Sequence, residues 1–191
     1  EQRSAEEIAA FYRMMKEKNE DYVCWLTVDG TAIDYPVVQR DNSFYLNHDF
    51  NGEKNRHGAI FMDELCNPED EVLLLHGHHM KDGTMFGDLK QYKEDGFRKE
   101  HRKITLESEG GISEYRIFAV ARVDLTDASS FRFEELPKTP EEKELYIEGL
   151  DASSFWYDDA QAQKDGAVLL LSTCDYGSDE ERLLVAAKKI E

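Results

Sequence analysis

The fold is decided by two neighbouring stretches, Gly166-Ala167-Val168-Leu169-Leu170-Leu171-Ser172-Thr173-Cys174 and Arg182-Leu183-Leu184-Val185-Ala186-Ala187, which an acidic loop separates. An apolar run without alternation that opens with glycine and ends in small polar residues is typical of a strand buried on both faces. If the two stretches form a hairpin, Cys174 and Arg182 lie opposite each other, roughly 5 Å apart at Cβ. The pattern therefore predicts a core strand that places a thiol beside a guanidinium.

A third stretch has the same design. It is Glu71-Val72-Leu73-Leu74-Leu75-His76-Gly77-His78, an apolar run that again ends in polar residues. The connection from this run to residues 166–174 is long enough for the two strands to be parallel. Parallel neighbours end at the same edge of a sheet, so we expect His78 to come near Cys174.

The rest of the chain indicates short strands with helices around them. Capping boxes predict one helix from Ser4-Ala5-Glu6-Glu7 to about Asn19 and another from Thr139-Pro140-Glu141-Glu142 to about Leu150. Further expected elements are strands in residues 25–28, 32–38, 58–62, 104–107 and 114–124, a short helix at 86–92, and a helix or wall-forming loop at 151–163. This census of about seven or eight short strands favours a mostly β barrel or sandwich in one domain, not alternating βαβ units.

The formal net charge of the 191 residues is −18. Such a field repels phosphate backbones, so we expect no nucleic-acid partner, although a well-solvated surface would explain the charge by itself. No window approaches the ~18 uninterrupted apolar residues of a membrane helix. The numbering begins at Glu1 without a methionine, which is compatible with a signal or membrane anchor that precedes this chain.

Three cysteines are too few for a disulfide framework, and the odd number leaves at least one free thiol. Cys24 lies in an apolar strand, where it is expected to act as a small buried hydrophobe. Cys66 precedes an Asn-Pro turn and is assigned no chemistry. A bridge between these two remains open, whereas Cys174 stands apart at the end of its strand.

Cys174, His78 and Arg182 together describe acyl transfer. A thiolate is a nucleophile, and a neighbouring cation lowers the pKa of its thiol. An imidazole can supply that cation or protonate a leaving amine, and a guanidinium can hold the oxyanion that forms when a carbonyl is attacked. The acidic loop from Asp175 to Glu181 works against thiolate formation.

Each of these residues also has a simpler interpretation. A lone cysteine at the end of a buried strand is more often inert packing than a nucleophile, and His78 alone would be a turn residue. The cluster His76-Gly77-His78-His79 could be half of a zinc site, but Met80 stands where the H-x-H-x-D-H pattern needs aspartate. We therefore expect no metal and no cofactor, with His76 as a wall residue and His79 as a turn donor.

Several motifs in the same order resemble a class B sortase. They are Leu171-Ser172-Thr173-Cys174 with arginine eight residues later, Gly77-His78 after an apolar strand, the segments 34–50 and 58–63, and Met80-Lys81-Asp82-Gly83-Thr84-Met85-Phe86. The resemblance implies a closed eight-stranded β-barrel with peripheral helices. The resemblance runs from about residue 20 to the C-terminus, so we expect residues 1–20 to form an N-terminal helix packed on the barrel and residues 21–191 to form the catalytic domain, in a single domain overall.

The resemblance also implies the roles of the site residues. Cys174 matches the nucleophile, His78 the catalytic histidine and Arg182 the residue that binds the oxyanion and substrate. The residues similar to those of the substrate groove are Ser172, Thr173, Asn42 and Leu46. The family more often has tyrosine at the position of His76 and asparagine at that of His79, so the hydrogen bonding of the histidines is expected to differ.

By this resemblance the protein is a cysteine transpeptidase on the outer face of a Gram-positive cell membrane. It would cleave a C-terminal sorting motif of a secreted protein and join the new carboxyl group to an amine of a peptidoglycan precursor or of a pilin. Its contact with the membrane would be an N-terminal anchor that this chain lacks. Two alternatives are a cysteine peptidase that only hydrolyses and a non-catalytic β-barrel that binds the cell wall.

Overall fold

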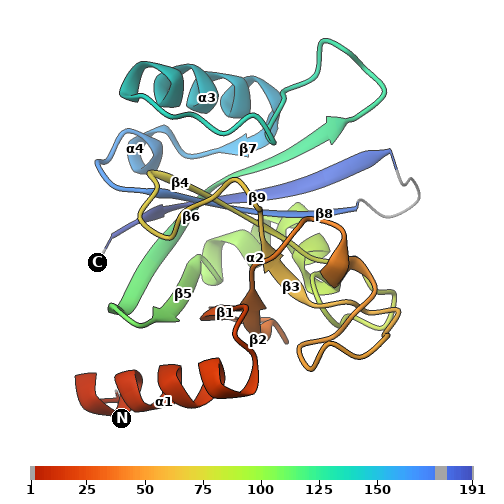
Figure 1. Cartoon of the computed structure of the whole chain (residues 1–191). Coiled ribbons are helices and arrows are strands. Elements are labelled where there is room, and N and C mark those ends of the chain that lie inside the picture. Colours follow the sequence, from red (N-terminus) through yellow and green to blue (C-terminus); the bar gives the residue numbers. More distant parts are fainter. Residues whose placement is uncertain (1–2, 175–179, 191) are drawn as a thin grey trace.

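The computed structural model describes residues 3–174 and 180–190 (Figure 1). The expectations for residues 175–179 of the acidic loop and for the side chain of Cys174 lie outside the described part. The helices are α1 (Ala5–Lys18), α2 (Asp95–Glu100), α3 (Pro140–Ser153) and α4 (Asp159–Ala162), with 3-10 turns η1 (Phe44–Leu46) and η2 (Gly87–Lys93). The strands are β1 (Tyr22–Val28), β2 (Asp34–Val38), β3 (Ile60–Met62), β4 (Val72–His76), β5 (Lys103–Ser108), β6 (Gly111–Asp124), β7 (Ser154–Tyr157), β8 (Val168–Cys174) and β9 (Glu181–Lys189).

Eight of these strands close into a barrel. Their order is β5-β1-β2-β3-β4-β8-β9-β6, and a direct pairing of β5 with β6 joins the two ends. Closure gives each of these strands a partner on both sides, so no strand of the barrel is paired on one side only. The expected eight-stranded barrel with an N-terminal helix and peripheral helices is therefore confirmed.

The centre of the barrel wall is β8, which is parallel to β4 and antiparallel to β9. Leu169, Leu170 and Leu171 are completely buried, as expected for a strand covered on both faces. Cys174 pairs with Arg182 across the hairpin. The parallel pairing and the hairpin predicted from the three apolar runs are thus both confirmed.

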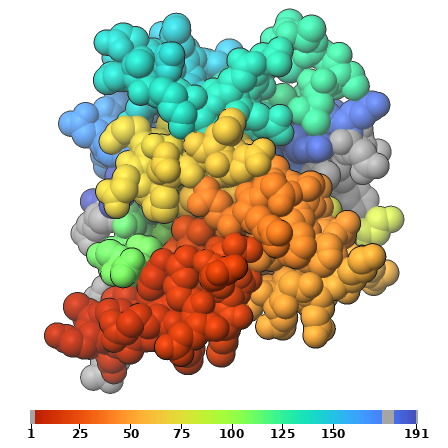
Figure 2. Space-filling view, in the orientation of Figure 1, coloured from red at the N-terminus to blue at the C-terminus, as the bar shows by residue number. Residues whose placement is uncertain are grey.

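The helices begin where the capping residues predict. Ser4 and Glu7 form the capping box of α1, and Thr139 caps α3 with Pro140 in its first turn. Aromatic rings attach α1 to β1: the centroids of Phe11 and Trp25 are 5.6 Å apart and those of Tyr12 and Tyr22 are 5.4 Å apart. In Figures 1 and 2, α1 (red) lies at one end of the molecule and α3 (teal) at the other.

Two expectations need correction. Residues 154–157, expected in a helix or loop, form β7, a ninth strand that pairs with β6 outside the barrel. Its residues Phe155, Trp156 and Tyr157 suit a strand, because aromatic side chains pack well on a pleated surface. The bridge left open between Cys24 and Cys66 is excluded, since both are free buried thiols. No helix in the described residues is long and apolar enough to cross a membrane.

Candidate active site

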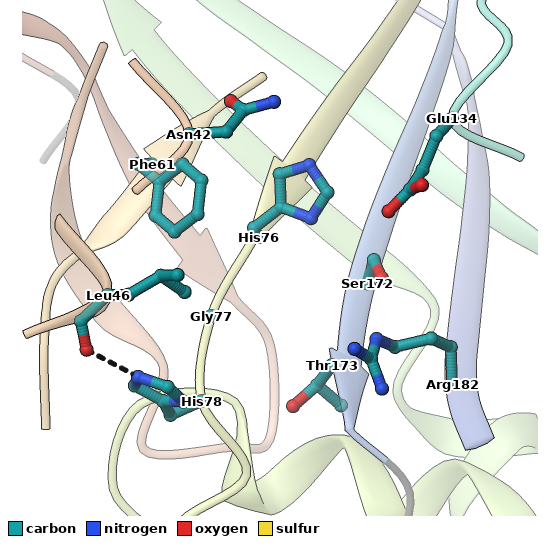
Figure 3. A pocket seen from close by; sticks show the side chains of 10 residues that line it. All are labelled: Asn42, Leu46, Phe61, His76, Gly77, His78, Glu134, Ser172, Thr173 and Arg182. Carbon is teal, nitrogen blue, oxygen red and sulfur yellow. Dashed lines mark hydrogen bonds between the residues drawn. The ribbon is translucent and has the colours of Figure 1, made fainter. Parts of the chain in front are cut away.

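A pocket of about 210 Å³ lies where β4 and β8 end and β9 begins (Figure 3). The residues that line it are Asn42, Leu46, Phe61, His76, Gly77, His78, Glu134, Ser172, Thr173 and Arg182. Six of them were singled out by sequence as candidate site residues. The barrel therefore brings segments far apart in the sequence to one small pocket.

The register of the strands explains this convergence. His76 of β4 is opposite Ser172 of β8, and the Gly77 amide continues the ladder by donating to the Ser172 carbonyl at 3.2 Å. On the other side of β8, Cys174 is opposite Arg182. His78 and Cys174 follow His76 and Ser172 by two residues each, so they stand at corresponding positions of the two parallel strands. The backbone thus places the three expected catalytic residues at one edge.

The His78 ring is held by the chain segment that carries Leu46. Its Nε2 lies 2.6 Å from the Leu46 carbonyl oxygen (Figure 3). A carbonyl oxygen only accepts, so Nε2 carries the proton of this hydrogen bond and Nδ1 is the nitrogen left to exchange protons. Gly58 packs against the same ring, because a Cβ there would lie 3.2 Å from His78 Cδ2.

Ser172 and Thr173 form the floor of the pocket, each 2% exposed. The Thr173 hydroxyl is buried and has no hydrogen-bond partner within the described part of the chain. In Figure 3 the Arg182 guanidinium turns from β9 toward Thr173, and His78 lies on the opposite side. Arg182 also donates from Nη1 to the Glu181 carbonyl at 3.2 Å. The pocket therefore offers a fixed positive charge beside a buried hydroxyl.

Sequence reasoning missed a buried carboxylate behind the pocket wall. Asp63 is 3% exposed, and its Oδ2 accepts hydrogen bonds from Asn42 Nδ2 at 2.9 Å and from His76 Nε2 at 3.0 Å. Burial raises the pKa of Asp63, but the hydrogen bonds from His76, the Leu65 amide and Asn42, together with the positive charge that His76 carries when it is protonated, outweigh it and hold the pKa below its usual value. Asp63 is therefore a carboxylate at neutral pH.

Phe61 and Glu134 were also missed as pocket residues. Phe61 stacks on the His76 ring with centroids 5.1 Å apart, and Glu134 reaches the pocket from the connection between β6 and α3. His76, expected as a wall residue, is one. Asp63 ends the segment 58–63, which carries part of the family resemblance, but neither Asp63 nor Glu134 was assigned a role, because their place depends on contacts between distant segments.

The other two thiols are unsuited to chemistry. Burial raises the pKa of Cys24 to about 12 and that of Cys66 to about 11, so neither forms a thiolate at neutral pH. Among the described side chains, no three or more His, Cys, Asp or Glu residues are grouped so that they could hold a metal ion. The polar side chains of this pocket lie next to Cys174, which pairs with Arg182.

Comparison with known proteins agrees with this geometry. The Sortase domain model matches residues 26–190. Sortase B of Listeria monocytogenes is 33% identical over 93% of this chain and 73% of its own length. The structure of the C232S mutant of Clostridium perfringens sortase B superposes with a TM-score of 0.89, at 34% identity over 98% of this chain and 90% of that one.

A Staphylococcus aureus sortase B–substrate complex has a TM-score of 0.81, with 26% identity over 96% of this chain and 86% of that one. The family model covers most of the chain, and the Listeria relative exceeds 30% identity over most of both sequences. The chain therefore belongs to the sortase family, in its class B, and is a cysteine transpeptidase that anchors surface proteins to the cell wall.

Proposed function

We propose that Cys174, His78 and Arg182 perform this reaction at the pocket, with Cys174 as nucleophile. The observation that carries the proposal is the register: Cys174 pairs with Arg182, and His78 follows the strand parallel to that of Cys174. The raised pKa of Cys24 and Cys66 supports the choice of Cys174, because it leaves one cysteine near a cation and an imidazole.

The first half of the reaction forms a thioester. The Cys174 thiolate attacks the carbonyl carbon of the scissile amide in the sorting motif, and the new oxyanion accepts hydrogen bonds from Arg182. When the C–N bond breaks, the leaving amine takes a proton from His78 Nδ1. The C-terminal fragment departs, and the remainder of the substrate is bound to sulfur as an acyl group.

The second half transfers the acyl group to an amine. The incoming amine attacks the thioester carbonyl, His78 takes one of its protons, and the thiolate leaves as the new amide forms. Because His78 loses its proton in the first half and regains it in the second, the enzyme returns to its starting state. Asn42, Leu46, Ser172 and Thr173 line the pocket in which the motif is proposed to bind.

Sortases are cell-surface enzymes of Gram-positive bacteria, and they act on proteins that carry a sorting motif. We propose that this chain works on the outer face of the membrane, attached by a segment N-terminal to α1. We propose as acceptor an amine of a peptidoglycan precursor or of a pilin subunit. The N-terminal helix (residues 1–20) and the catalytic part (21–191) are proposed to form one domain.

The decisive experiment is mass spectrometry of the chain after incubation with a panel of sorting peptides. We expect a mass increase equal to the N-terminal acyl portion of the cleaved peptide, located on Cys174 by peptide mapping. The Cys174→Ala chain should show neither adduct nor cleavage, whereas Cys66→Ala, which removes a buried thiol, should keep both. An adduct on another residue, or cleavage by Cys174→Ala, would overturn the assignment.

Addition of hydroxylamine or a peptide amine tests the transfer step. A transpeptidase should release more product, and the product should carry the amine. Release of free acid alone, unchanged by amine, would instead identify a hydrolytic peptidase.

A further inference from the structure

Two neighbouring side chains hold the ring of the pocket residue His76. Phe61 stacks on one face of its ring, and Asp63 binds Nε2 on one edge. The side chain is 17% exposed, and in Figure 3 the ring stands between Phe61 and Asn42 on one side and Ser172 and Glu134 on the other. The pocket therefore meets an imidazole whose orientation is fixed before any substrate binds.

Asp63 also fixes the tautomer of this imidazole. A carboxylate only accepts hydrogen bonds, so the proton between Asp63 Oδ2 and His76 Nε2 belongs to the histidine. In the neutral ring, Nδ1 is then a lone-pair acceptor. Within the described residues, no other group forms a hydrogen bond with Nδ1. A neutral His76 thus presents one acceptor to the pocket.

The other polar groups around the pocket differ in what they offer a peptide. Arg182 only donates, and the Ser172 and Thr173 hydroxyls can donate or accept. The Glu134 carboxylate, on the connection between β6 and α3, accepts. The Asn42 amide is occupied at both ends, because Nδ2 donates to Asp63 and Oδ1 accepts from the Glu64 amide at 2.8 Å. A bound peptide backbone has N–H groups as well as carbonyls, and these need acceptors.

We propose that His76, oriented by Asp63, is a substrate-binding residue whose Nδ1 accepts a hydrogen bond from an N–H group of the sorting peptide. This inference rests on the proposed function, since it places the peptide in the pocket beside Cys174. It assigns to the Asp63–His76 pair a role in affinity, separate from the proton transfers of His78. Asp63 is a positioning residue, because it acts through His76.

Protonation of His76 removes the acceptor. The imidazolium carries N–H at both nitrogens and faces the peptide N–H with a donor. The charged and titratable groups around it are Asp63 at Nε2, Glu134 across the pocket, Arg182 on β9 and His78 after β4. KM should therefore be higher at a pH at which the His76 ring is protonated than at one at which it is neutral.

Three variants test the proposal with the fluorogenic sorting peptide that the wild-type chain cleaves fastest. His76→Phe keeps the stacking on Phe61 but has no nitrogen, so KM at pH 7.5 should rise roughly 3- to 10-fold with kcat nearly unchanged. His76→Gln keeps an acceptor that does not titrate, so it should restore much of the affinity. In both variants KM should lose its rise at low pH.

Asp63→Asn tests whether the orientation of His76 matters, because it changes the partner that orients the ring and keeps the histidine itself. The single carboxamide oxygen of the variant can no longer accept from the Leu65 amide at Oδ1 and from both Asn42 Nδ2 and His76 Nε2 at Oδ2. The hydrogen bonding that orients the His76 ring is therefore weakened, and KM should rise although His76 is intact. A structural role of Asp63 alone would lower thermal stability without selectively raising KM, so the unfolding midpoint of each variant is measured in parallel.

His101→Phe is the matched control. His101 also packs on a phenylalanine, with its ring centroid 4.5 Å from that of Phe97, and faces an aspartate, with Nδ1 3.5 Å from Asp29 Oδ2. It does not line the pocket, so KM and its pH profile should stay those of the wild type.

Wild-type KM at every pH in His76→Phe or Asp63→Asn would overturn the inference and leave the proposed function intact. Turnover by Cys174→Ala would instead overturn the proposed function itself.

Discussion

The two ends of one sheet face make an instructive comparison. Alternation along β8 puts Val168, Leu170 and Ser172 on the same face, and their β9 partners Lys188, Ala186 and Leu184 share it. Arg182 and Lys188 thus stand near opposite ends of the same strand, roughly 20 Å apart at ~3.3 Å per residue. At each of these two ends a cationic side chain lines a pocket.

The pocket near Lys188 is the larger of the two, with a volume of about 1150 Å³ compared with about 210 Å³ for the pocket at Arg182. Two of its lysines, however, are paired or buried. Lys143 contacts Glu71 at 2.5 Å, and Lys188 is 4% exposed, with its pKa lowered first by burial and then by Lys143. The comparison shows that the volume of a pocket does not identify the active site. Polar side chains that converge on an opening identify it.

Arg182 and Lys188 should differ most in catalysis. Loss of one oxyanion donor lowers kcat by about 10²–10³-fold, so we expect that loss for Arg182→Ala. Lys188→Met, at the other end of the strand, should keep kcat and KM of the wild type. Steady-state cleavage of a sorting peptide by both purified chains checks this, and equal losses in the two would show that the ends are not functionally distinct.

Arg182→Lys sharpens the same comparison. Lysine keeps the charge but lacks the planar fork of donors, so the variant should recover only part of the activity lost in Arg182→Ala. Full recovery would mean that charge alone suffices at this position.

Leu170 lies on the same face midway between the two ends and is completely buried. Leu170→Ala should lower the free energy of unfolding by about 2–5 kcal/mol, because it removes buried methyl groups and leaves a cavity. Turnover per folded molecule should change far less than in Arg182→Ala. Urea unfolding followed by tryptophan fluorescence, with activity measured in the absence of urea, separates the two effects. A loss of activity as large as that of Arg182→Ala would link the core to catalysis.

Much of the barrel could be predicted because its central strands are encoded locally. Leu169 to Leu171 are apolar without alternation, which indicates burial on both faces. If the next apolar run forms a hairpin with this strand, the residue count along the two strands gives Arg182 as the partner of Cys174. β7 could not be predicted in this way. It follows α3 without a turn signal, and it is a strand only because β6 extends beyond the barrel and offers it an edge.

The residues of the site also divide into those that the strand pattern predicts and those that it does not. Arg182 and His78 stand at the ends of core strands, so the pattern of those strands predicts their place. Asp63 lies behind the pocket wall and Glu134 lines the pocket, both from loops, and loop paths depend on packing that no periodicity records. The contact between Asp63 and His76 joins residues 13 apart in sequence across β3 and β4, which alternation alone does not reveal.

Asp63, at the pocket end, should make the free energy of unfolding depend on pH in the acidic range. Its pKa is lowered in the folded chain, so its contribution is present above the unfolded value of about 3.9 and is lost as pH falls through the folded value. We expect the wild type to lose stability below about pH 5 more steeply than Asp63→Asn, by roughly 1–3 kcal/mol in total. Thermal unfolding from pH 7 to pH 3 measures this, and parallel curves would contradict it.

Lys188 should give the opposite end a pH dependence of the same sign, but in the alkaline range. Burial lowers its pKa in the folded chain, so over the interval between the folded and unfolded values the unfolded chain binds more protons and stability rises with pH. At neutral pH the charged form carries a desolvation cost that Lys188→Met removes while keeping a side chain of similar length. We therefore expect Lys188→Met to be more stable than the wild type by about 1 kcal/mol at pH 7, and the difference to shrink as pH approaches about 10. Urea titrations of both chains at pH 7, 8.5 and 10 test the sign. If Lys188→Met were the less stable chain at pH 7, attraction from Glu71 and Asp165 would have to exceed the desolvation cost, and this lysine would be a stabilising partner instead of a buried charge.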